Sequence, residues 1–218
     1  MRDAHTRDLG LSSRLPAFLL GFMAASFQVF LLREFAAEFS GNELTFGLFL
    51  GSWLLWGGLG SLVRPEAGAG LAGSARLAVL FSAAVILFFA GLAVLRVSHK
   101  LLGLLPAEQT GLGPALGFAL LVGLLIGFPL GHAFVLNAGL LGGDVASVYV
   151  RESAGAAAAG LLVHFLLVPN LSNWEGGAVV GAFSALAVLA ALRPGRRAVA
   201  VPAAAVLLAA AVARMDLP

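Results

Sequence analysis

Hydrophobic positions fall in long blocks along this chain, and short polar connectors separate the blocks. A helix needs about 20 apolar residues to cross a bilayer core. The blocks therefore predict an all-α, polytopic integral membrane bundle of about seven helices. They cover residues 15–35, 44–63, 75–97, 113–135, 145–168, 176–192 and 198–213. Because the last two blocks are short and only "RPGRR" separates them, six spans followed by an interfacial tail is the alternative.

The blocks also divide the chain into regions. We expect residues 1–14 to form a cytoplasmic amino-terminal tail, 15–213 the transmembrane bundle and 214–218 a short carboxyl-terminal tail. The first block is longer than the roughly 7–15 apolar residues of a secretory signal, so it is predicted to be an uncleaved helix. The segment 97–109 mixes apolar and polar residues and is predicted to include a short helix in the outer interface.

The distribution of basic residues sets the expected orientation, because cytoplasmic loops of membrane proteins are enriched in Lys and Arg. An amino terminus inside the cell places eight basic residues in cytoplasmic connectors and four on the opposite side. The inner set is Arg2, Arg7, Arg14, Arg64, Arg76, Arg193, Arg196 and Arg197, and the outer set is Arg33, Arg96, Lys100 and Arg214. We therefore expect the amino terminus inside.

Composition supports this class and excludes others. Hydrophobic side chains make up 60% of the 218 residues and charged ones 11%, against about 25% charged in an average soluble domain. The net charge is +2 and the basic residues are scattered among connectors, which excludes a nucleic-acid partner. The absence of cysteine excludes disulfides, thiolate catalysis, iron–sulfur ligation and c-type haem attachment. We predict a multi-pass protein of a bacterial-type inner membrane.

Glycine spacing predicts close helix packing. Lipid provides no hydrophobic force between helices, so small residues four positions apart favour association by letting backbones approach. The candidates are Gly47 and Gly51, Gly113 and Gly117, Gly123 with Gly127 and Gly131, and Gly155 with Ala159. We expect them to hold the second, fourth and fifth spans together.

The stretch "SFQVFLLREFAAEF", residues 26–39, places Gln28, Arg33, Glu34 and Glu38 at the end of the first span. Arg33 lies near the edge of the hydrocarbon, where a long side chain can reach the headgroups. Glu34 and Glu38 are four residues apart on one helical face and repel each other. A basic group from another helix, a shared proton or a bound cation must compensate them.

A second charged pair, Arg151 and Glu152, lies early in the fifth span and near the opposite face of the membrane from Arg33. Adjacent residues do not face each other on a helix, so Arg151 needs Asp144 or a polar group on another helix. His164 lies near the outer end of the same span and is expected to be an interfacial anchor, with His99 as its nearest histidine. His132 and His164 lie near opposite faces of the membrane, and His99, in a loop, is a weak second ligand for His164, so no haem is expected within the chain.

Several motifs carry a resemblance to a known family. They are "GFMAASFQVFLLREFAAEFSGNELTFGLFLGSWLLWGGLGS" (21–61), "GFPLGHAF" (127–134) and "VYVRESAGAAAAGLLVHFLLVP" (148–169). In order, these resemble the membrane-spanning region of membrane-bound spermidine synthase-like proteins. The matching residues are Gln28, Arg33, Glu34, Gly41, Glu43, Gly47, Gly57, Gly60, Phe128, Pro129, Tyr149, Glu152, Gly155 and Gly160. We expect this protein to be the membrane region without the soluble aminopropyltransferase-like domain that follows in fused members, so the resemblance implies no catalytic residues.

Three functions stay open. The first is a membrane subunit or anchor of a multi-protein complex, such as an electron-transfer assembly, with membrane lipids and redox proteins as partners and no catalytic chemistry or metal of its own. The second is a transporter for a small molecule or polyamine-like cation, in which glycines and Pro129 break a helix. The third is a quinone- or lipid-binding protein. The candidate polar network in all three is Gln28, Arg33, Glu34, Glu38, Arg151, Glu152 and His164.

Overall fold

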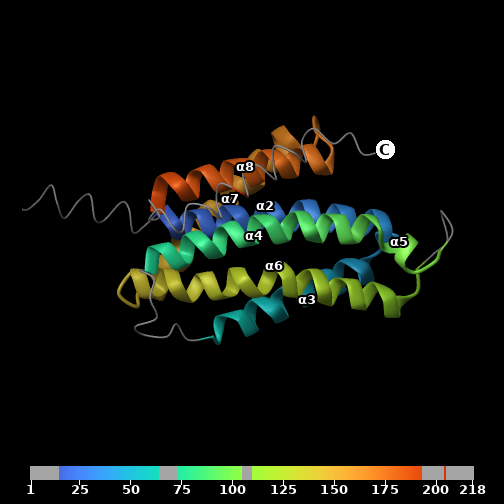
Figure 1. Ribbon diagram of the computed structural model, residues 1–218, viewed down its shortest axis with the longest axis horizontal. Helices are drawn as coiled ribbons and strands as arrows, with labels where there is room; N and C mark the ends of the chain where they lie inside the picture. The colour runs from blue at the N-terminus through green and yellow to red at the C-terminus, as the bar shows by residue number, and fades with distance from the viewer. Residues whose placement is uncertain (1–14, 64–72, 105–109, 193–203, 205–218) are drawn as a thin grey trace, which may run out of the picture.

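The computed structural model describes residues 15–63, 73–104, 110–192 and 204. Regular structure in these residues is helical throughout, with no strand among them. The elements are α2 (Leu15–Glu38), α3 (Glu43–Ser61), α4 (Gly73–Arg96), α5 (Ser98–Leu101), α6 (Leu112–Leu140), α7 (Val145–Leu162), the π-helix η1 (Val163–Leu167) and α8 (Asn173–Leu192). They run back and forth along one long axis (Figure 1).

Six of these elements are long and apolar enough to cross a membrane, counting α7 and η1 as one span. The prediction of a multi-pass helical bundle is thus confirmed, and the first six predicted blocks each correspond to one span. The block 198–213 lies outside the described residues. In the segment 97–109, the structure describes one short helix, α5, beside the end of α4.

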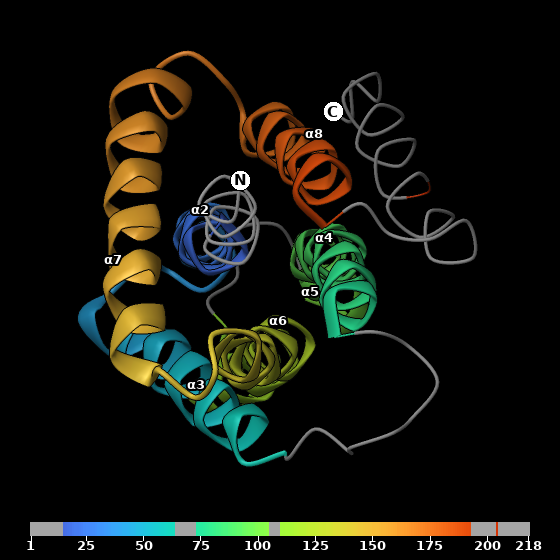
Figure 2. The same cartoon turned by 90° about the vertical axis from the view of Figure 1, so that its left-hand side faces the viewer.

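Helix α2 is the centre of the bundle. Seen from one end, α3, α4, α6, α7 and α8 surround it (Figure 2), and it contacts each of them. Its apolar stretch is 61% buried, against 22% for α3 and 22% for the span Val145–Leu167. Fully buried aromatic side chains, including Phe27, Phe30 and Phe35, fill the space around α2. The charged residues that end this helix therefore lie against its neighbours.

Glycines bring two pairs of helices into backbone contact. Between α3 and α6, a Cβ on Gly131 would overlap the carbonyl oxygen of Gly57, and one on Gly60 would overlap that of Phe128. The prediction that glycines join the second and fourth spans is therefore correct. The fifth span packs elsewhere: Gly155 of α7 meets the carbonyl oxygen of Phe18 in α2. Its predicted packing on the second and fourth spans is wrong, because the central helix occupies that side of α7.

Pro129 lies inside α6, which continues through it for 29 residues. The predicted break of this helix is therefore wrong. A proline removes one backbone donor, but membrane helices tolerate it where neighbouring helices pack against them. Here α3 and α4 both pack on α6.

Local turn chemistry determines how two helices begin. Between α2 and α3, Ser40 and Gly41 adopt positive φ angles of 67° and 50°, which reverse the chain. Asn42 then caps α3, because its side chain accepts a hydrogen bond from the Thr45 amide. Helix α8 begins with a capping box: the Ser172 hydroxyl accepts from the Glu175 amide, and the Glu175 carboxylate accepts from the Ser172 amide. This box places Asn173 and Trp174 in the first turn of α8.

Candidate functional site

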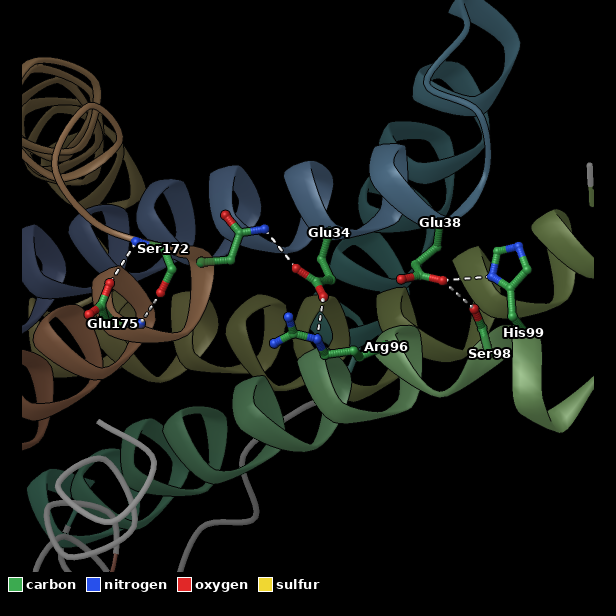
Figure 3. Close-up of polar contacts among 8 residues, drawn as sticks. Glu34, Glu38, Arg96, Ser98, His99, Ser172 and Glu175 are labelled. Atoms are coloured by element: carbon green, nitrogen blue, oxygen red, sulfur yellow. Dashed lines mark hydrogen bonds and ion pairs between the residues drawn. The ribbon is translucent and has the colours of Figure 1, made fainter. Parts of the chain in front are cut away.

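The end of α2 carries a set of paired polar side chains, which we call the Glu34 network. It consists of Glu34, Glu38, Arg96, Ser98, His99 and Asn173. The last turns of α2 and α4, the helix α5 and the first turn of α8 meet at this end of the bundle (Figures 1 and 3). Three separate parts of the sequence therefore contribute to the network.

Glu34 is the buried member of the network, with 7% of its surface exposed. Asn173 donates a hydrogen bond from Nδ2 to its Oε2 at 2.7 Å. Its Oε1 lies 3.8 Å from the Nε of Arg96, whose guanidinium also lies 5.7 Å from the centre of the Trp174 ring. A buried carboxylate is costly unless it is paired and hydrogen-bonded, and both conditions hold here.

Glu38 has its own partners one turn further along α2. Its Oε2 lies 2.7 Å from the Nδ1 of His99 and accepts a 3.4 Å hydrogen bond from the Ser98 hydroxyl. Of the three ways to compensate Glu34 and Glu38, the structure places basic groups from another part of the chain beside both (Figure 3). Each carboxylate therefore has its own neighbouring basic side chain, Arg96 for Glu34 and His99 for Glu38, which offsets the repulsion between the two.

Arg33 and Gln28 lie outside the network. The Nη1 atom of Arg33 is buried and has no hydrogen-bond partner among the described residues. Arg33 points away from Glu34 because adjacent helical residues are about 100° apart. Gln28 is half-buried and makes no hydrogen bond within the described part of the chain. The structure therefore separates these two residues from the glutamates that the sequence groups with them.

At the opposite end of the bundle, Arg151 bonds within its own helix. Its Nη1 donates to the Ser147 carbonyl oxygen at 2.7 Å. Asp144 caps the same helix by accepting from the Ser147 amide at 3.0 Å. Hydrogen bonds from the Ser147 side chain and amide lower the pKa of Asp144 below its usual value, and the positive charge of Arg151 adds to this shift. Arg151 is thus satisfied locally, without a polar group from another helix.

Glu152 lies beside a pocket of about 220 Å³. Residues of α2, α3, α6 and α7 line it, and apolar side chains and glycines predominate among them. No hydrogen bond or ion pair joins Glu152 to another residue in the described ranges, although its side chain is only partly exposed. Glu152 is thus a carboxyl group within a membrane-spanning helix that no other described residue pairs.

His164 is separate from both regions. It lies in the π-helix η1, is exposed, and packs edge-on against Phe165 with 4.9 Å between ring centres. His99 binds Glu38 instead of approaching a second histidine. Among the described residues there is no group of three His, Asp or Glu side chains that would hold a metal ion.

The sequence alone did not identify Arg96, Ser98, His99 and Asn173 as the partners of Glu34 and Glu38. Two signals were present. "SNWE" at 172–175 has the spacing of a capping box, which starts a helix with Asn173 in its first turn. "RVSH" at 96–99 places polar residues at the predicted level of Glu34 and Glu38.

No protein-family model, curated protein or solved structure matches this chain. The resemblance to the spermidine synthase-like membrane region therefore stays a prediction from its motifs.

Proposed function

We propose that this protein is a membrane subunit of a larger assembly, and that a transmembrane helix of a partner packs on the outward face of α3. The observation that carries the proposal is the surface of that helix. One side of α3 is closely packed on α6 through Gly57 and Gly60. The other side exposes Gly47 and Gly51, and a Cβ at either position would meet nothing within 4 Å.

Helix association in lipid depends on close packing at small residues. Within α3, the same residue type therefore has two different surroundings. Apolar side chains flank the open glycines, with Leu50 38% and Leu54 72% exposed. A face of this kind lets a second helix approach the backbone closely between flanking leucines. That the assembly transfers electrons stays a prediction, as does the identity of its other subunits.

A transporter has less support, because the helix break on which that interpretation rested is absent at Pro129. Binding of a small molecule is a second candidate, favoured by the pocket beside Glu152. The open glycines lie in the first half of α3 and the pocket residues in its second half, and Leu54 borders both sites.

The proposal is tested with Gly51→Leu, which fills the open face of α3 without entering a packed contact. Gly160→Leu is the matched control, because Gly160 of α7 is also exposed with nothing within 4 Å of an added Cβ. Each protein is extracted from native membranes in mild detergent, separated by native electrophoresis and identified by mass spectrometry.

We expect wild type and Gly160→Leu to migrate with the same additional subunits, and Gly51→Leu to migrate without them while remaining folded by circular dichroism. Migration of wild type as a lone chain would contradict the proposal. Retention of every partner by folded Gly51→Leu would exclude α3 as the docking face.

A further inference from the structure

We propose that the pocket beside Glu152 binds the cationic head of a lipophilic monoamine that enters from the membrane. This is a ligand site, and it goes beyond the docking function proposed above. Its parts are a carboxyl group that has no partner in the described part of the chain, walls of aromatic and small residues, and a rim on the outside of the bundle.

The depth of Glu152 makes its lack of a partner informative. It follows the first residue of α7 by seven positions, about 10 Å of helix, in a hydrocarbon core about 30 Å thick. Ionisable residues at such depth are costly and commonly mark binding sites or pathways. Glu34, which is buried by the bundle, accepts a hydrogen bond from Asn173 and faces Arg96. Glu152 has no such partner among the described residues.

The charge of the pocket favours a monovalent cation. Among the described residues, Glu152 is the one ionisable residue in its lining, and the Ser61 hydroxyl there already donates to the Gly58 carbonyl oxygen at 2.7 Å. A bare metal ion requires several oxygen ligands, and an amine with several charges requires several carboxylates. A single ammonium group requires one carboxylate, and the lining supplies one.

The walls suit an ammonium group with an apolar body. Trp53 and Phe134 are the aromatic residues among those that line the pocket, and aromatic faces attract alkylammonium ions. Arg151 does not occupy the site, because its Nη1 donates to the Ser147 carbonyl one turn earlier in α7. Arg151 therefore leaves the Glu152 carboxylate free to bind a cationic ligand.

The size and position of the pocket suggest how the ligand lies. At about 220 Å³ it is smaller than the roughly 300–1,000 Å³ of sites that enclose a drug-sized molecule. It therefore accepts a head group and a few carbons. Gly58 and the 72% exposed Leu54 lie at its rim on α3, so the tail of the ligand extends into lipid.

The experiment measures equilibrium binding of radiolabelled octylamine to the full-length protein in detergent micelles at neutral pH, with binding to empty micelles subtracted. Unlabelled octylammonium, octanol and octanoate compete; they share a chain length and differ in the charge of the head. Glu152→Gln removes the charge and keeps the shape. Gly58→Leu fills the rim, and nothing lies within 4 Å of an added Cβ there. Gly160→Leu is the matched control: it lies on the helix that carries Glu152, outside the pocket, with nothing within 4 Å of an added Cβ.

We expect octylammonium to compete at least about tenfold better than octanol or octanoate. Glu152→Gln and Gly58→Leu should each weaken octylamine binding by a similar factor, and Gly160→Leu should leave it unchanged. Equal binding by wild type and folded Glu152→Gln would overturn the proposal. So would equal competition by octanol, which would indicate a purely apolar site.

Discussion

Glu34 and Glu152 are both glutamates within apolar helices, and the bundle surrounds them differently. Glu34 is at the end of the central helix, where Asn173 donates to it and Arg96 lies beside it. Glu152 is on α7, a helix at the periphery of the bundle, beside a pocket and without a partner in the described ranges. At position 34 the glutamate side chain thus joins packed helices, whereas at position 152 it remains available to a ligand.

The difference separates a structural role from a binding role. A buried carboxylate that has partners joins the elements that provide them, and removal of that carboxylate leaves the partners unsatisfied. An unpaired carboxylate contributes nothing of this kind and is retained at a cost in stability. A residue of the second kind is the stronger candidate for function.

The largest effect on stability should come from replacing Glu34 by leucine, and the same change at Glu152 provides the comparison. Glu34→Leu leaves the Asn173 amide without its acceptor and Arg96 without its counter-charge, so we expect a loss of about 1–3 kcal/mol in the free energy of unfolding. Glu152→Leu removes an unpaired group and should be neutral or slightly stabilising. Unfolding by SDS titration in mixed micelles measures both. Equal destabilisation by the two changes would remove the distinction between them.

A smaller effect, the coupling free energy between pairs of substitutions, should distinguish the partners of Glu34 from Arg33, its neighbour in sequence. In double-mutant cycles, Glu34→Gln should couple to Asn173→Ala by about 1 kcal/mol, because that hydrogen bond is 2.7 Å long and buried on the Glu34 side. Coupling to Arg96→Gln should be weaker, since the ion pair is 3.8 Å long and 37% of the Arg96 side chain is exposed.

Arg33→Gln provides the control for these cycles and should be additive with Glu34→Gln. Strong coupling of this pair would mean that Arg33, and not Arg96 or Asn173, neutralises Glu34.

The smallest effect concerns the cap of the helix that carries Glu152. Bonding to Ser147 lowers the pKa of Asp144 in the folded protein. Its stabilising contribution is therefore complete above the usual aspartate pKa of about 4 and is lost as pH falls through the lower folded value. Asp144→Asn should remove this pH dependence and leave stability at neutral pH little changed. Melting temperatures measured between neutral and strongly acidic pH test the expectation, which a parallel pH profile for both proteins would contradict.

The spans were predictable because each requires only a long apolar block, and helices such as α4 and α6 begin within a few residues of the predicted positions. That Glu34 and Glu38 need compensation was also predictable from their spacing. Their actual partners were not, because Arg96, His99 and Asn173 reach them only after α4, α5 and α8 have packed on α2.

Glycine packing shows the same limit. Gly47 and Gly51 have the spacing of Gly127 and Gly131, yet the first pair is open and the second contacts α3 closely. The spacing indicates that backbones can approach, whereas the rest of the bundle determines whether a helix is there. The fifth span was misplaced for this reason: Gly155 predicts a close neighbour and does not identify α2 as that neighbour.

The π-helix at the end of α7 has a consequence for the evolution of the chain. A π-turn is an α-helical turn that contains one additional residue, and here Val168 donates to the Val163 carbonyl oxygen five positions earlier. Each residue rotates an α-helix by about 100°. Loss of one residue within Val163–Leu167 would therefore restore a regular helix and rotate everything after it, including the loop that delivers Asn173 to Glu34. The π-turn thus sets the rotational position of α8 relative to α7. A deletion in this turn would have to be compensated by an insertion between it and Ser172.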